Sequence, residues 1–235
     1  MNNLTVLTYT HSNCSDVHQM YLDSYETYFD GVKHVVLVNS PINNNRITEV
    51  IYDDNSDYYE QMLLGLSKID TDYIIYSQED CILYDLVDKN LITKYIDLLN
   101  NDKDIMFLRL INAGLLGTEK DYNDEFVIID SDNQYYFSCQ ITIWRKSVLE
   151  ETLKLSKPKF ISEEPKNSPY LKSLNGLGLC TKIVGEKVGG HYNSLIYPYI
   201  AVAILRGRWN FTEYEDKLEI LINKYNIDKN KRGII

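Results

Sequence analysis

The first eighty residues alternate between short apolar runs and longer mixed runs, and this alternation restricts the fold more than any other feature of the sequence. Apolar, β-branched runs predict strands, and the mixed runs between them predict helices. A strand, a helix and a second strand form the crossover unit of a parallel α/β sheet. The sequence predicts strands at 4–9, 34–39, 49–52 and 73–77, with helices at 17–29 and 57–68.

The second half of the chain is less regular, and three prolines with several glycines predict loops between residues 156 and 190. At 235 residues the chain fits one domain, which we divide into two halves, 1–110 and 111–235. Further elements are expected as helices at 87–99 and 147–155, strands at 105–110, 126–129 and 135–144, and closing helices at 195–205 and 212–225.

The clearest chemical signal is an apolar strand, 73–77, that runs directly into Gln78, Glu79 and Asp80. In open α/β sheets, ligands bind outside the carboxyl ends of the strands. Carboxylates at such an edge are costly unless a cation meets them, and a divalent metal ion is the natural partner. The alternative interpretation is a solvated acidic turn.

The charge balance limits what this protein binds. Asp and Glu number 34 against 24 Lys and Arg, which gives a net charge of −10. Such a surface repels nucleic acid and anionic lipid, so we expect no nucleic-acid partner. A phosphate-bearing ligand therefore needs a local cation, either a few basic side chains or a bound metal ion.

Cysteine usage and hydropathy predict a cytoplasmic protein. Cys14, Cys81, Cys139 and Cys180 are far apart and form no CxxC pair, which favours reduced thiols. The start of the chain lacks the pattern of a signal peptide. No apolar run approaches the roughly 18 residues that would span a bilayer, so no transmembrane segment is expected.

The segment around Asp80 resembles that of nucleotide-sugar glycosyltransferases with the GT-A fold, of the polysaccharide or capsule type. The lead-in at 71–76, Thr-Asp-Tyr-Ile-Ile-Tyr, precedes Gln78-Glu79-Asp80, where that family has its DxD motif. The first Asp of the motif is replaced by Gln78. The resemblance implies a Rossmann-type α/β sandwich with a central, mostly parallel sheet and C-terminal helices. It also implies Mn²⁺ or Mg²⁺ held by Asp80, with Glu79 as a further ligand.

Three later segments resemble parts of the same family in the same order. The stretch 136–145 resembles a segment that leads to an acceptor loop. Glu163 and Glu164 resemble the acidic pair that supplies the catalytic base in inverting members. His191 follows Gly189 and Gly190 and resembles the late histidine that completes the metal site. An exposed loop pair and a polar surface histidine are the alternative interpretations.

Nucleotide contacts are expected at the ends of the first three strands. Thr8, Tyr9, Thr10 and His11 end the first strand, Asn39 ends the second, and Asp53 or Asp54 follows the third. An ordinary turn at 39–41 and a helix cap at 53–55 are the alternatives. The candidates for phosphate contact are Arg206 and Arg208, with Lys187 as a third, although these arginines also suit a solvated helix terminus.

These features together predict a glycosyltransferase that moves a sugar from a nucleoside-diphosphate sugar, most readily a UDP-sugar, to a glycan or other hydroxyl acceptor. The expected reaction is metal-assisted and inverting, with a Glu base. A non-catalytic nucleotide- or glycan-binding relative is one alternative, favoured by Gln78. A sugar-phosphate nucleotidyltransferase ranks lower, because the loop 8–15 contains no glycine. Tyr135, Tyr136, Trp144 and Trp209 could stack on a sugar, but aromatic residues are more often core.

Overall fold

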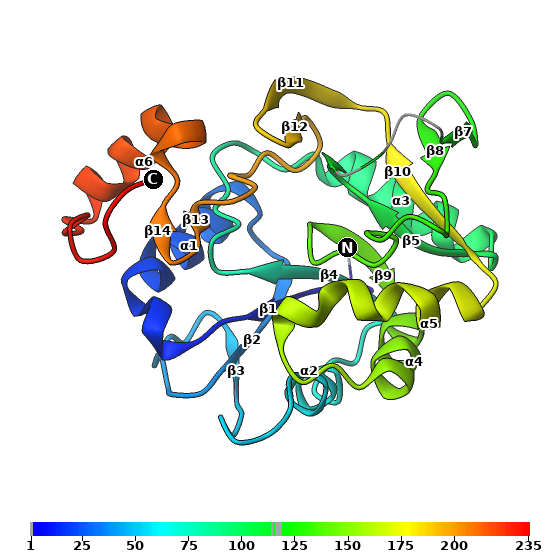
Figure 1. The fold of residues 1–235 in the computed structure, drawn as a ribbon, viewed down its shortest axis with the longest axis horizontal. Helices are drawn as coiled ribbons and strands as arrows, with labels where there is room; N and C mark the ends of the chain where they lie inside the picture. The colour runs from blue at the N-terminus through cyan, green and yellow to red at the C-terminus, as the bar shows by residue number, and fades with distance from the viewer. Residues whose placement is uncertain (1, 114, 116–118) are drawn as a thin grey trace.

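The computed structural model describes residues 2–113, 115 and 119–235, and it is built on one nine-stranded sheet (Figure 1). The strand order is β3-β2-β1-β4-β9-β5-β10-β8-β7. Both halves of the chain contribute strands to it. The strands are β1 (Leu4–Tyr9), β2 (Lys33–Val38), β3 (Thr48–Ile51), β4 (Tyr73–Gln78), β5 (Ile105–Arg109), β7 (Lys120–Asp121), β8 (Phe126–Ile128), β9 (Thr142–Arg145) and β10 (Leu177–Thr181).

The four strands β3, β2, β1 and β4 are mutually parallel, as the crossover pattern predicts. The register pairs Tyr9 with Gln78, so β1 and β4 end side by side at one edge of the sheet. Strand β9 is antiparallel to both β4 and β5, whereas β10 runs parallel to β5. The parallel strands therefore bring the residues that follow β1, β2, β3 and β4 to the same edge.

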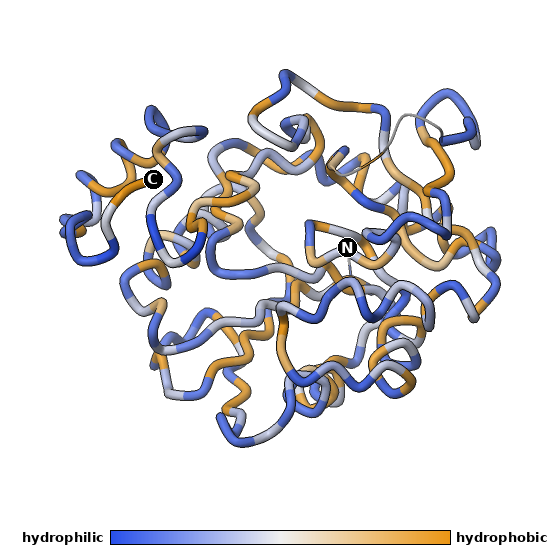
Figure 2. Tube along the Cα trace, in the orientation of Figure 1, coloured by the Kyte–Doolittle hydropathy of each residue, from blue (hydrophilic) through white to orange (hydrophobic). Residues whose placement is uncertain are grey.

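Helices cover both faces of the sheet, because the parallel strands are apolar on both sides. Along β4, Tyr73 and Ile75 belong to one core, whereas Ile74 and Tyr76 belong to the other. Figure 2 shows hydrophobic segments running through the interior. The first core packs α1 (Ser15–Tyr28), α3 (Lys89–Asn101) and α6 (Phe211–Lys224), and the second packs α2 (Tyr58–Leu66), α4 (Lys146–Ser156) and α5 (Ser168–Ser173).

Two small sheets lie beside the main one. Strand β12 (His191–Ser194) lies between β11 (Val184–Val188) and β6 (Asn112–Ala113). The β13–β14 hairpin (Ile204–Leu205 and Arg208–Trp209) precedes α6. The short 3-10 helices η1 (Ser12–Cys14) and η2 (Ile161–Asn167) complete the elements. None of the described helices is long and apolar enough to cross a membrane.

The expected helix at 195–205 is wrong. This apolar run forms bends and turns before β13, and its backbone bonds the segment after β4 instead of itself. The N–H of Tyr84 donates to the carbonyl of Pro198 at 3.1 Å, and the N–H of Ile200 donates to Ile82 at 2.9 Å. Pro198 removes one helical donor, and burial on several sides explains why the run is apolar throughout.

Two further expectations differ from the structure. Only Thr142–Arg145 of the expected strand 135–144 is a strand, because the part before it turns over the sheet edge. The expected loops at 156–190 instead contain η2, α5 and the strands β10 and β11. Gly178 made strand β10 hard to predict, because glycine is typical of loops. In the structure this glycine leaves room for the ring of Phe107, since a Cβ at Gly178 would lie 2.2 Å from that ring.

Candidate active site

A cavity of about 390 Å³ lies at the carboxyl edge of the sheet and brings together three of the predicted site residues. Asp80 follows β4, Glu164 lies in η2, and His191 begins β12. All three line the cavity. Because these elements come from distant parts of the chain, the cavity depends on the tertiary fold and on no local motif.

Asp80 lies in the wall of this cavity and is partly buried. Burial and the neighbouring charge of Glu79 raise the pKa of Asp80 to about 7, and a hydrogen bond from the backbone of Ile204 opposes that rise. The contact with Ile204 ties the end of β4 to the β13–β14 hairpin. A carboxyl group in this setting gains from a nearby cation, which would stabilise its ionised form.

Glu79 points to a different environment from Asp80 and is not among the residues that line the cavity. It lies beside the thiol of Cys14, where burial and this carboxylate raise the pKa of Cys14 to about 12. Burial also lowers the pKa of His18, and the charge of Glu79 opposes that shift. Glu79 therefore contributes charge at the edge of β4 without sharing the cavity with Asp80.

The two glutamates of the acidic pair have separate contacts. Glu164 accepts a hydrogen bond from the backbone N–H of Cys139, and burial raises the pKa of its carboxyl group. Glu163 instead accepts from the backbone N–H of Lys159 at 2.8 Å and pairs with Lys166. Only Glu164 of the pair is placed to act on a molecule in the cavity.

His191 presents an unsatisfied ring nitrogen. Burial lowers the pKa of His191, so the imidazole is neutral at pH 7, and its buried Nδ1 has no hydrogen-bond partner. A neutral imidazole and a carboxylate are both suitable ligands for a Mn²⁺-like ion. Among the described residues, however, no three His, Cys, Asp or Glu side chains are grouped closely enough to hold a metal ion. Asp80 and His191 thus supply at most part of a coordination shell.

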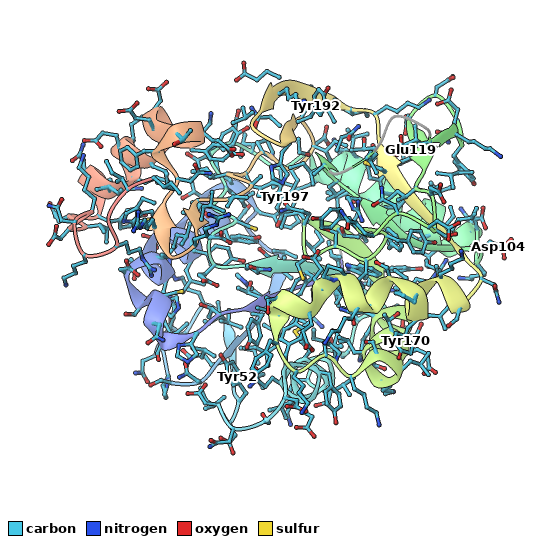
Figure 3. All side chains as sticks on the ribbon, in the orientation of Figure 1. Tyr52, Asp104, Glu119, Tyr170, Tyr192 and Tyr197 are labelled. Atoms are coloured by element: carbon cyan, nitrogen blue, oxygen red, sulfur yellow. The ribbon has the colours of Figure 1, made fainter. Side chains whose placement is uncertain are left out.

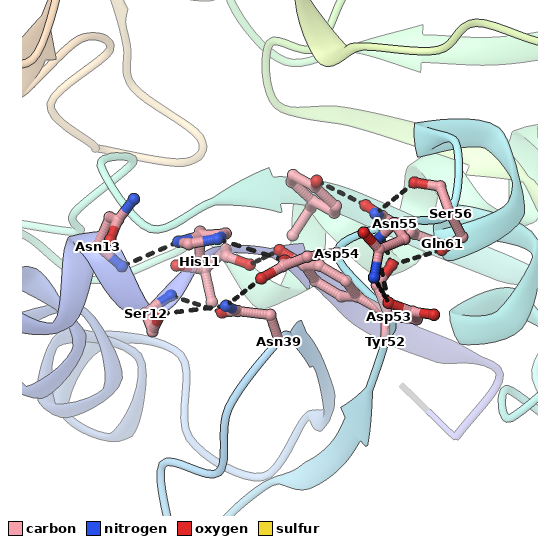
Figure 4. A network of polar contacts seen from close by, with 12 residues as sticks. His11, Ser12, Asn13, Asn39, Tyr52, Asp53, Asp54, Asn55, Ser56 and Gln61 are labelled. Carbon is pink, nitrogen blue, oxygen red and sulfur yellow. Dashed lines mark hydrogen bonds and ion pairs between the residues drawn. The ribbon is translucent and has the colours of Figure 1, made fainter.

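A second cluster joins the ends of the first three strands (Figure 4). The Asn39 amide donates to Asp54 at 2.9 Å and to the hydroxyl of Ser12 at 3.1 Å. Its oxygen accepts from the backbone N–H of Ser12 at 2.8 Å. The Nε2 atom of His11 lies 3.3 Å from the other carboxylate oxygen of Asp54. The structure therefore brings together His11, Asn39 and Asp54, three of the residues that the sequence offered as candidates for nucleotide contact.

Aromatic and amide side chains flank this cluster. The rings of Tyr9 and Tyr52 stack with centroids 5.5 Å apart, and the Tyr9 hydroxyl donates to Gln61 at 2.7 Å. Asp53 caps the next turn, where its carboxylate accepts from the backbone and the amide of Asn55, each at 2.9 Å. Asp53 therefore has a local role in the turn, whereas the N-cap of α2 is Asp57, and Asp54 is the member of the pair that joins the cluster.

Thr8 and Thr10 are buried, and their hydroxyl groups bond protein atoms. Thr8 shares hydrogen bonds with Tyr21 at 2.6 Å and with Nε2 of His34 at 2.7 Å. Thr10 bonds His18 at 2.9 Å. Because both side chains are buried and bonded to other side chains, Thr8 and Thr10 cannot reach a nucleotide directly.

The basic candidates lie outside the cavity. Arg206 and Arg208 are exposed on the β13–β14 hairpin, where the positive φ angles of Arg206 and Gly207 form the tight turn. Neither arginine makes an ion pair with another described residue. Lys187 lies on β11, with its ammonium group 5.8 Å from the ring centre of Tyr192. In Figure 3, Tyr192 lies at the periphery of the molecule and Tyr197 near its middle.

Sequence reasoning missed Arg109, which ends β5 and is 1% exposed. Its Nη2 donates to the carbonyl oxygens of Tyr135 and Tyr136, at 2.7 and 3.2 Å, and its Nε has no partner. The charges of Arg109 and Glu164 attract each other. A charged residue directly after the apolar run 105–108 was the available signal, because a buried charge requires partners.

Several solved structures are similar in fold to this chain. The mannosyltransferase PcManGT from Pyrobaculum calidifontis, in complex with GDP-Man and Mn²⁺, matches with a TM-score of 0.50 and 8% identity, over 80% of this chain and 58% of its own. TarS from S. aureus matches with a TM-score of 0.50 and 10% identity, over 82% of this chain and 36% of its own. The bifunctional IspDF from Campylobacter jejuni matches with a TM-score of 0.45 and 16% identity, over 83% of this chain and 52% of its own.

In all three comparisons this chain spans less than two thirds of the solved chain. No protein-family model matches the sequence, and a search of curated proteins gives no match. The protein has the mixed α/β fold, with a large and mostly parallel central sheet, that the GT-A resemblance implied. That expectation is confirmed at the level of the fold.

Proposed function

We propose that the protein is a metal-assisted glycosyltransferase that takes a sugar from a nucleoside-diphosphate sugar, with a UDP-sugar as the first candidate. The observation that carries this proposal is the shared cavity of Asp80, Glu164 and His191 at the carboxyl edge of a GT-A-like sheet. The solved mannosyltransferase with the same fold holds GDP-Man and Mn²⁺. That likeness in fold supports the proposal, and the role of each residue is argued from the contacts of this chain.

The donor nucleotide would lie along the cluster of His11, Asn39 and Asp54. Asp54 offers carboxylate oxygens to the N–H groups of a base or the hydroxyl groups of a ribose. Tyr9 and Tyr52 offer ring faces beside it. The diphosphate would then extend toward Asp80, because β1 and β4 end side by side.

Asp80 and His191 would hold a divalent metal ion, either Mn²⁺ or Mg²⁺. Two observations fit a cation there, namely the pKa of Asp80, raised by burial and by Glu79, and the unpartnered Nδ1 of His191. A bound metal ion would stabilise the negative charge that develops on the leaving diphosphate. On a protein with a net charge of −10, the exposed Arg206 and Arg208 are the nearest alternative source of positive charge.

Glu164 would act as the general base on the acceptor hydroxyl. Its carboxylate faces the cavity, and its raised pKa makes it a better proton acceptor than an exposed glutamate. A base opposite the leaving group is the arrangement for an inverting reaction. The sequence left Glu163 and Glu164 as alternatives, and the contacts of Glu163 with Lys159 and Lys166 favour Glu164.

A non-catalytic nucleotide- or glycan-binding protein is the second candidate. Two observations favour this candidate. Gln78 replaces the first carboxylate of the motif, and the described residues form no group of three metal ligands. Such a protein would bind the same molecules without turning over the donor. The two candidates differ in metal dependence and in donor hydrolysis.

Thermal unfolding with a panel of nucleotides tests the donor site. UDP, GDP and their sugar conjugates are added with and without Mn²⁺, and a ligand at 100 times its Kd should stabilise the fold by about 2.7 kcal/mol. We expect one nucleotide to stabilise the wild-type protein only with Mn²⁺, and Asp80→Asn to lose that effect. Glu163→Gln is the control, since Glu163 does not line the cavity and is bonded to Lys159 and Lys166.

Two results of this experiment would contradict the proposal. Stabilisation that is equal with and without Mn²⁺ would remove the metal role from Asp80 and His191. A nucleotide that binds with Mn²⁺, but whose sugar conjugate is never hydrolysed or transferred, would support the non-catalytic candidate instead.

A further inference from the structure

The cavity that holds Asp80 and Glu164 is acidic and otherwise neutral. Among the described residues that line it, no lysine or arginine is present. The polar groups between the two carboxylates are uncharged, and they include the side chains of Gln78, Ser138 and Gln140. A cleft with charge of one sign repels ligands of that sign.

A bound metal ion and donor would not reverse this sign. A divalent cation carries two positive charges, and the diphosphate of the donor carries two negative ones. The charges of Asp80 and Glu164 therefore remain as the surplus in the cavity. Arg109 is buried behind the wall, with its Nη2 bonded to two backbone carbonyl groups, and its charge offsets part of the charge of Glu164 without reaching the cavity.

Tyr135 supplies an aromatic face in the same cavity. It is 40% exposed, and its backbone is fixed on both sides. The Tyr135 N–H donates to the side chain of Asn133 at 2.8 Å, and its carbonyl accepts from Arg109 at 2.7 Å. A rigid, exposed ring beside hydroxyl-binding groups suits the apolar C–H face of a sugar ring.

We infer that the acceptor taken by this cavity is an uncharged saccharide, stacked on Tyr135, and that phosphorylated or uronic acid acceptors are excluded. This inference rests on the proposed function in placing the acceptor in the cavity. The amides of Gln78 and Gln140, the Ser138 hydroxyl and the Glu164 carboxylate bind sugar hydroxyl groups, which both donate and accept hydrogen bonds. A carboxylate or phosphate on the sugar would meet the like charges of Asp80 and Glu164, and no lysine or arginine among the described lining residues could pair with it.

Saturation-transfer NMR with matched sugars tests the inference without an enzyme assay. Methyl β-glucoside is compared with methyl β-glucuronide, and N-acetylglucosamine with its 6-phosphate, at pH 8 in metal-free buffer. We expect each neutral sugar to bind on the order of tenfold more tightly than its anionic partner. Equal or tighter binding of the anionic sugars, or binding of none of the four, would overturn the inference.

Variants locate the binding and its charge dependence. Tyr135→Ala should abolish the signal of the neutral sugars, whereas Tyr170→Ala should not, because Tyr170 is similarly exposed on α5 but does not line the cavity. Glu164→Gln keeps the shape of the side chain and removes one charge, so it should reduce the preference for neutral sugars severalfold. An unchanged preference would show that the charge of Glu164 does not select the acceptor.

The outcome separates this inference from the proposed function. If neutral sugars bind through Tyr135 but no nucleotide binds with Mn²⁺, the cavity is a neutral-saccharide site and the transferase proposal fails. If a nucleotide binds with Mn²⁺ and the anionic sugars bind as well as the neutral ones, the donor proposal stands and the acceptor inference fails.

Discussion

Glu163 and Glu164 are adjacent in the chain, yet only the carboxylate of Glu164 faces the cavity that also contains Asp80. Glu164 is held there by the backbone N–H of Cys139. Glu163 closes the turn before η2 through the backbone of Lys159, 2.8 Å away, and pairs with Lys166. Because the two residues share charge, size and sequence context, they form a matched pair for mutation.

Glu164→Gln should lower donor turnover in the presence of an acceptor by about 10²–10⁴-fold, the usual loss when a general base is removed. Glu163→Gln should change turnover by less than about twofold, since that side chain is committed to its own turn. Release of nucleoside diphosphate measures both. If Glu163→Gln is the more damaging change, Glu164 is not the base.

His34 should make the stability of the fold sensitive to acid. Burial lowers the pKa of His34 to about 3, below the ordinary value near 6.5 that it regains in the unfolded chain. The unfolded state then binds the extra proton first, so the free energy of unfolding is highest above pH 6.5 and falls as the pH drops toward 3.

His34→Phe removes the titrating group and should flatten that pH dependence, by up to about 4 kcal/mol between pH 7 and pH 3. Denaturant unfolding at a series of pH values gives the measurement. The variant also loses the hydrogen bond to Thr8, which lowers its stability at every pH. A slope equal to that of the wild type would mean that folding does not lower the pKa of His34.

Gly189 and Gly190 precede His191 but have different roles. Gly189 has a φ of +56°, and a Cβ at this position would lie 2.0 Å from a carboxylate oxygen of Glu213. A Cβ on Gly190 would meet nothing within 4 Å. The β11–β12 turn therefore requires the first glycine, and two adjacent glycines cannot be told apart from the sequence alone.

Gly189→Ala should lower the free energy of unfolding by about 1–3 kcal/mol, because alanine at positive φ is strained and Glu213 must move. Gly190→Ala should stay within about 0.5 kcal/mol of the wild type. Thermal or denaturant unfolding of the two variants provides the comparison. Equal effects of the two changes would contradict the turn geometry.

Arg109 should be a structural support of the cavity wall. Arg109→Ala leaves the carbonyl groups of Tyr135 and Tyr136 without their donor and opens a cavity under the turn, which should cost about 2–4 kcal/mol. Hydrogen exchange at residues 133–137 should accelerate more than exchange in β1. A uniform change across the protein would indicate that Arg109 does not hold this turn specifically.

Much of the fold was predictable because its first half follows local rules. Alternation of apolar and mixed segments gave the parallel strands β1, β2, β3 and β4 and the helices between them to within a few residues. The second half was less predictable, since its segments gain stability from distant partners. The run 195–205 shows this, because its backbone bonds Tyr84 and Ile82 instead of forming a helix.

The site was predicted in part for the same reason. Strand ends can be located in a sequence, so Asp80, Asn39 and Asp54 could be named as candidates at one edge. The burial of Thr8 and Thr10 could not be predicted, because it depends on side chains from other elements that pack over the end of β1. His34 and Tyr21 bury the hydroxyl group of Thr8.

The sequence by itself determined the class of fold, the acidic edge after β4 and the need for a local cation if phosphate is to bind. These properties depend on residues close together in the chain or on composition. Only the tertiary structure decided that Asp80, Glu164 and His191 share one cavity, that Glu163 does not, and that Arg109 supports Tyr135. Burial and pairing between distant segments produce these relationships, and neither is encoded in the spacing of residues along the chain.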